Sequence, residues 1–88
     1  MKTIRVENIN NSPNQFRVWT KQGMYFQSYN SIILFIPYDS GIKTQLDKNT
    51  WDYSSTTGRY RNIVLGEDKK ETERKIKEGF YNLVDLNS

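Results

Sequence analysis

Residues 15–36 read QFRVWTKQGMYFQSYNSIILFI, and this stretch decides the fold. In Gln15–Thr20 and again in Met24–Ser28, apolar side chains alternate with other residues, which is the period of a strand with one buried face. Lys21–Gly23 separates the two segments, and we predict a short hairpin loop in which Gly23 is able to take a positive φ.

Further strands extend this hairpin in both directions. Thr3–Ile9 precedes it, separated by Asn10–Asn14, whose Asn, Ser and Pro residues favour a turn. Ile32–Ile36 is apolar at every position, which predicts a central strand that is covered on both faces. Ile42–Leu46 is predicted to close an antiparallel β-meander.

The second half of the chain changes to helical periodicity. A helix over residues 55–65 would begin after the N-cap oxygens of Asp52–Ser55 and end at Gly66, the usual glycine beyond a helix C-terminus. Its predicted inward face is the set Thr56, Tyr60, Ile63 and Val64.

A second helix begins at Asp68, because Glu71 three residues later resembles a capping box, and it ends at Gly79. Only Ile76, helped by Thr72, gives this helix an inward face, so it should lie on the surface. Two i,i+4 ion pairs are expected along it, Glu71 with Lys75 and Glu73 with Lys77.

Together these segments predict an α+β fold: an antiparallel β-meander of four to six short strands, with two short helices in the C-terminal half. Phe80–Leu86 is the last candidate strand, and whether it joins the meander is left open. At 88 residues the chain forms a single domain over residues 1–88, because two separate cores would each be too small.

Composition restricts the chemistry. The chain contains neither Cys nor His, so disulfides, the usual transition-metal sites and the commonest general base are all excluded. We therefore expect no catalytic residue, no metal and no cofactor. Asp39, Asp47 and Asp52 are the acids outside helices and termini, and turn formation explains Asp39 while a place before the first helix explains Asp52. The longest apolar run, Ile32–Ile36, is far below the roughly 20 residues that cross a bilayer, so we expect a cytoplasmic protein without a membrane partner.

Three segments resemble a family of small uncharacterised domains that bacteriophages and mobile elements of low-GC Gram-positive bacteria carry. They are WDYSSTTGRYRN at residues 51–62, LGE at residues 65–67 and KIKEGFYNLVDL at residues 75–86. The resemblance covers about the last two thirds of the chain. It implies an accessory phage protein that inhibits a host protein or ribonucleoprotein complex by stoichiometric binding, as anti-CRISPR and other anti-defence proteins do.

A protein-binding surface is predicted on one sheet face. Alternation places Arg17, Trp19, Tyr25 and Gln27 on this face, and Phe16, Val18, Met24 and Phe26 on the other. Aromatic residues and arginine are enriched at binding hot spots, so we predict a protein-binding site at Arg17, Trp19, Tyr25 and Tyr29.

The alternative function is DNA or RNA binding by basic residues of the two helices. The candidates are Arg59, Arg61, Lys69, Lys70 and Arg74. Interleaved basic and aromatic residues can pair with phosphates and stack on bases. For Arg59 and Arg61, the favoured interpretation is two solvated side chains beside an inward-pointing Tyr60. For Thr56–Arg59, a capped helix start is favoured over a phosphate-binding site. Strand edges of a small sheet also permit a homodimer.

Overall fold

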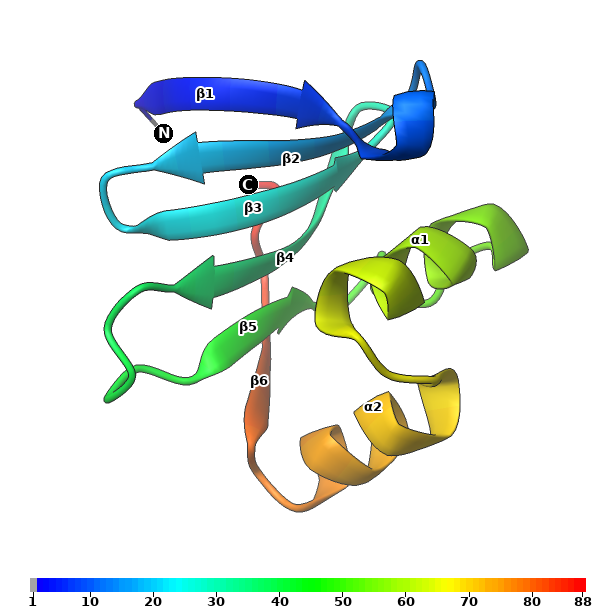
Figure 1. Ribbon diagram of the computed structural model, residues 1–88. Coiled ribbons are helices and arrows are strands. Elements are labelled where there is room, and N and C mark those ends of the chain that lie inside the picture. Colours follow the sequence, from blue (N-terminus) through cyan, green and yellow to red (C-terminus); the bar gives the residue numbers. More distant parts are fainter. Residues whose placement is uncertain (1) are drawn as a thin grey trace.

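The computed structural model describes residues 2–88 as a six-stranded sheet with two α-helices (Figure 1). The elements are β1 (Thr3–Asn8), the 3-10 turn η1 (Ile9–Asn11), β2 (Gln15–Thr20), β3 (Gly23–Ser28), β4 (Ser31–Pro37), β5 (Thr44–Asp47), α1 (Ser55–Leu65), α2 (Lys69–Lys77) and β6 (Tyr81–Val84). Within residues 2–88, neither helix has the length and apolar character needed to span a membrane. The predicted α+β class is confirmed.

The strands lie in the order in which the chain makes them, β1-β2-β3-β4-β5-β6. All neighbouring pairs are antiparallel except β5 and β6, which run parallel. Parallel neighbours need a crossover connection, and here the crossover consists of α1 and α2. The last strand, whose place the sequence left open, therefore joins the sheet at the edge beside β5.

The core lies between the helices and one face of the sheet. Its fully buried members are Ile9, Phe26, Ile33, Leu34 and Leu46. The helices contribute apolar side chains that pack against this cluster, namely Tyr60, Val64, Leu65 and Ile76. Both helices thus cover the same sheet face, as Figure 1 shows, and no helix covers the other.

Strand β4 is buried for a different reason from the one predicted. Phe26 pairs with Leu34 and Gln27 with Ile32, so Ile33 is an extra residue without a partner on β3. Such a β-bulge changes the local direction of side chains, and here the successive residues Ile33 and Leu34 both enter the one core. The prediction that β4 is covered on both faces was wrong, because Ile32 and Phe35 remain only half-buried.

The predicted sheet face is also wrong, by one residue of register. The β2–β3 turn contains only Lys21 and Gln22, so Arg17 pairs with Phe26 and Val18 with Tyr25. Because side chains alternate with a period of two, this shift moves every β3 side chain to the face opposite the predicted one.

Gly23 belongs to β3 and not to the predicted loop, and its φ is not positive. It is required because the backbone of β4 lies against it: a Cβ at this position would lie 2.3 Å from the carbonyl oxygen of Ile36. The turn is instead organised by Thr20, whose Oγ1 accepts hydrogen bonds from the backbone N–H of Gln22 (3.2 Å) and of Gly23 (3.3 Å).

Helix α1 has the predicted ends. The Ser54 side chain accepts a hydrogen bond from the N–H of Thr57, and Gly66 ends the helix with a φ of 68°. The inward face is rotated from the predicted one, since Thr56 is exposed and Ile63 is 41% exposed. Thr57 is buried instead, and its hydroxyl lies 3.0 Å from that of Ser28 on β3.

Candidate functional site

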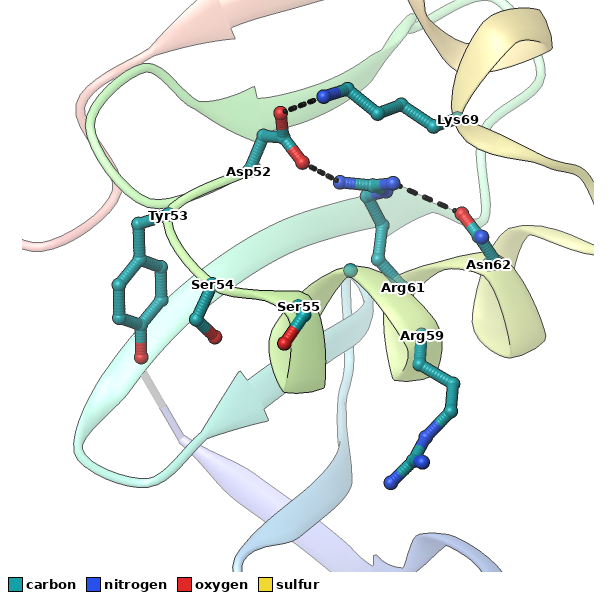
Figure 2. Close-up of a pocket in the computed structure, with 9 residues that line it drawn as sticks. Asp52, Tyr53, Ser54, Ser55, Arg59, Arg61, Asn62 and Lys69 are labelled. Atoms are coloured by element: carbon teal, nitrogen blue, oxygen red, sulfur yellow. Dashed lines mark hydrogen bonds and ion pairs between the residues drawn. The ribbon is translucent and has the colours of Figure 1, made fainter.

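Arg61 on α1 lies between Asp52 and Asn62 and bonds to both (Figure 2). Its side chain is 1% exposed, and it donates hydrogen bonds to the Trp51 carbonyl (2.7 Å), Asp52 Oδ1 (3.0 Å) and Asn62 Oδ1 (3.0 Å). The guanidinium also lies 5.2 Å from the centroid of the Trp51 ring. The prediction of a solvated Arg61 was therefore wrong, because the loop before α1 supplies two oxygens to its buried Nη1, while Nε has no hydrogen-bond partner among residues 2–88.

Asp52 connects the two helices. Besides its ion pair with Arg61, Asp52 forms an ion pair with Lys69 at the start of α2, in which Lys69 Nζ lies 2.7 Å from Asp52 Oδ2. Burial raises the pKa of Asp52, but the hydrogen bonds and charges of Lys69 and Arg61 outweigh it and lower the pKa below its ordinary 3.8. An open hollow of about 520 Å³ lies beside this cluster. Since Asp52 already pairs with both cations, the cluster works as a clamp between loop and helices.

Gly58 lies beneath this guanidinium inside α1. A Cβ built there would lie 3.6 Å from the nearest Arg61 nitrogen, an ordinary contact distance. Glycine in a helix interior costs about 0.5–1 kcal/mol relative to alanine. We expect Gly58→Ala to raise the free energy of unfolding by up to about 1 kcal/mol in urea titration. A loss of stability would mean that the clamp tolerates no added methyl group.

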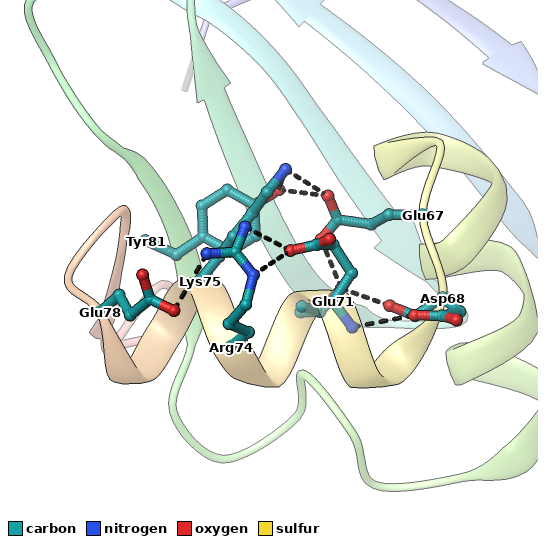
Figure 3. A network of polar contacts seen from close by, with 8 residues as sticks. Glu67, Asp68, Glu71, Arg74, Lys75, Glu78 and Tyr81 are labelled. Carbon is teal, nitrogen blue, oxygen red and sulfur yellow. Dashed lines mark hydrogen bonds and ion pairs between the residues drawn. The ribbon is translucent and has the colours of Figure 1, made fainter.

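Helix α2 has its own network of polar contacts (Figure 3). Asp68 caps the helix by accepting the N–H of Glu71 (2.8 Å), as predicted. Glu67, just before the helix, accepts hydrogen bonds from Thr72 Oγ1 (2.6 Å), Lys75 Nζ (2.7 Å) and Tyr81 Oη (2.9 Å). Burial raises the pKa of Glu67, yet these three donors together lower it below 4.5.

The two predicted i,i+4 ion pairs are not formed among the described residues: Glu71 and Lys75 have other partners, and Glu73 and Lys77 make no ion pair within residues 2–88. Lys75 pairs with Glu67, and Glu71 pairs with Arg74, which also reaches Glu78 Oε2 at 3.0 Å. Of the five basic residues proposed for nucleic-acid binding, Arg61, Lys69 and Arg74 are therefore held by carboxylates. Arg59 and Lys70 have no ion pair within residues 2–88.

Asp47 has a structural role that its position after an apolar segment does not reveal. It is 1% exposed and accepts hydrogen bonds from the N–H of Leu86 (2.8 Å), the N–H of Thr50 (2.9 Å) and Thr50 Oγ1 (2.8 Å). Burial raises its pKa, but these bonds outweigh burial and lower it below 3.8. Asp47 thus fixes the C-terminal segment against β5.

The helix-free face of the sheet carries a continuous row of apolar side chains. In register across β1–β4 these are Val6, Val18, Tyr25 and Phe35, and Phe16 lies beside them. The Tyr25 and Phe35 rings stack with centroids 4.4 Å apart. A hollow of about 260 Å³ opens at Val6, Phe16, Val18, Thr3 and Gln27. We call Val6, Phe16, Val18, Tyr25 and Phe35 the open face.

A sequence model described as a family of unknown function (DUF8033) matches residues 3–79. The chain belongs to DUF8033. No curated protein and no solved structure matches it. The family assignment covers both the strands of the open face and the helices with the Arg61 clamp.

In this DUF8033 member the four residues predicted for protein binding do not form one surface. Tyr25 lies on the open face. Arg17 and Trp19 share the opposite face with Phe26, and Tyr29 is exposed in the β3–β4 turn with a φ of 54°. Trp19 is half-buried under Arg5, whose guanidinium lies 4.6 Å from its ring centroid. Phe16 was missed because it was predicted to share a face with Phe26, which lies in the core, and Phe35 was missed because β4 was predicted to be covered on both faces.

Proposed function

We propose that this protein acts by stoichiometric binding of another protein, and that the open face is its binding surface. The observation that carries the proposal is the helix-free row from Val6 to Phe35, which ends on the stacked pair Tyr25 and Phe35 and in which Val18 is 5% exposed. Contiguous apolar patches on the surface of a small domain mark interaction sites, and aromatic side chains dominate the energy of such interfaces.

The partner we propose is a host complex in the bacterial cytoplasm. The resemblance of residues 51–86 to phage and mobile-element proteins supports this choice, and so does a sequence without His or Cys, which favours binding over catalysis. The protein would then inhibit a host defence complex, such as a CRISPR or restriction complex, by occupying a surface that the complex needs.

Nucleic-acid binding is the less favoured alternative. Phosphate binding by Arg61, Lys69 or Arg74 would require these side chains to leave carboxylates at 2.7–3.0 Å, which offsets the electrostatic gain. Arg59 and Lys70 are two separate charges and not a basic stripe. The charge distribution therefore supports a protein partner.

Substitution of Phe16 on the open face tests the proposal. Phe16→Asp should remove capture of the partner from host lysate and weaken binding of the purified partner by roughly 30-fold or more, as expected for a hot-spot residue. The matched control is Ile63→Asp, which places the same charge on the outer side of α1, where Ile63 is 41% exposed. Melting temperatures of both variants establish that each is folded.

Two results would contradict the proposal. One is equal capture by Phe16→Asp and Ile63→Asp. The other is an eluate that contains nucleic acid alone and that dissociates steeply with salt, as counterion release requires.

A further inference from the structure

Strand β1 forms one edge of the sheet, and its outer side has no partner within residues 2–88. Ile4 is 64% exposed and Val6 is 54% exposed, although both are β-branched residues that favour the interior of a sheet. An edge strand of six residues with exposed apolar side chains is a template for pairing with another strand. We propose that two copies of this chain pair antiparallel through β1, and this proposal is independent of the proposed function.

The hydrogen-bond pattern of the sheet shows which β1 groups are free. The N–H of Tyr29 donates to the carbonyl of Asn14 at 2.7 Å. Alternate residues of an antiparallel strand bond to alternate neighbours, so Phe16 and Val18 bond to β3, whereas Arg17 and Trp19 bond to β1. Their β1 partners are Glu7 and Arg5. The backbone N–H and C=O of Val6, between these two, therefore point away from the sheet.

A two-fold axis through Val6 gives the pairing that these free groups and the charges favour. Val6 then exchanges both backbone hydrogen bonds with Val6 of the second copy, and Arg5 lies opposite Glu7 of the second copy on each side of the axis. Opposite charges directly across a strand pair are stabilising, and like charges are destabilising. An axis through Arg5 would place two arginines opposite each other, with backbone groups that already bond to β2.

The side chains beside this axis are held in place for such pairing. Arg5 lies over Trp19 with its guanidinium 2.6 Å from Glu7 Oε2, and Glu7 Oε1 lies 3.9 Å from Arg17. Val6 lies in the row of the open face, so the two open faces would become one apolar surface that continues across both copies.

Charge reversal with rescue tests the dimer. Light scattering coupled to gel filtration should show a dimer for the unaltered chain. Arg5→Glu and Glu7→Arg each place two like-charge contacts across the axis and should weaken dimerisation by about tenfold or more. The double variant Arg5→Glu/Glu7→Arg restores both opposite-charge contacts and should restore the dimer.

An unaltered chain that is monomeric at millimolar concentration would overturn the proposal. Single variants that dimerise as well as the unaltered chain would also overturn it, as would a double variant that does not regain the dimer. Hydrogen exchange gives a second measurement: the Val6 amide should be protected in the dimer and exchange freely in folded monomeric Arg5→Glu. A dimer with an unprotected Val6 amide would also overturn it. None of these results affects the Phe16→Asp test of partner binding.

Discussion

Arg61→Ala is expected to lower the free energy of unfolding by about 3–4 kcal/mol, because removal of the buried guanidinium leaves its oxygen partners without a donor and opens a cavity. The Trp51 carbonyl would lose its 2.7 Å donor, and Asn62 Oδ1 would lose its own. Asp52 would keep Lys69, so the loss comes mainly from the unpaired carbonyl and from the cavity left by a fully buried side chain. Urea denaturation followed by circular dichroism measures the effect.

Arg59→Ala is the matched control on the same helix. Arg59 is exposed and has no ion pair within the described residues, so its truncation should change the free energy of unfolding by no more than about 0.5 kcal/mol. Equal effects of the two substitutions would show that the buried guanidinium is not a clamp between loop and helices.

Gly23→Ala is expected to destabilise the protein by about 2 kcal/mol or more, through overpacking against backbone. The added Cβ would lie 2.3 Å from the Ile36 carbonyl oxygen and 2.8 Å from both Phe35 Cε1 and Pro37 Cα. Two of these three atoms belong to the β4 backbone, so relief requires β3 and β4 to separate. The melting temperature and the urea midpoint should both fall.

Gly41→Ala provides the control for Gly23→Ala. Gly41 is exposed in the β4–β5 loop, and its nearest neighbour would be the carboxylate oxygen of Asp39 at 3.2 Å, on a side chain that can rotate away. We expect a near-neutral effect. A Gly23→Ala variant as stable as Gly41→Ala would mean that the β3–β4 approach is not tight.

Local signals in the sequence predicted the elements well. Ser54 and Gly66 bound α1 as expected, Asp68 caps α2, and the strands lie within a residue or two of their predicted ends. Each of these features depends on residues close in the chain, through capping oxygens, positive φ and side-chain period. The α+β class could therefore be predicted without tertiary information.

The open face and the buried polar clusters could not be predicted in the same way, because they depend on contacts between residues that are far apart in the chain. One residue more or less in the turn at Lys21 and Gln22 exchanges the two faces of β3, and local sequence does not determine that length. The burial of Arg61 depends on oxygens of Trp51 and Asp52, which a helical pattern does not reveal. The same holds for Asp47, whose donor Leu86 lies on the far side of both helices in the chain.

The parallel pairing of β6 with β5 sets an order for folding. Strands β1 to β5 are joined by hairpins, and contacts close in sequence form fast because little loop entropy is lost. Thr44 meets Tyr81 only after the intervening chain has closed a loop that contains both helices. The meander should therefore condense first and β6 should dock last, and the bonds from Leu86 to Asp47 and from Asn87 to the Ile32 backbone would form at the end. By the same path in reverse, the C-terminal segment should be the first part of the native molecule to open.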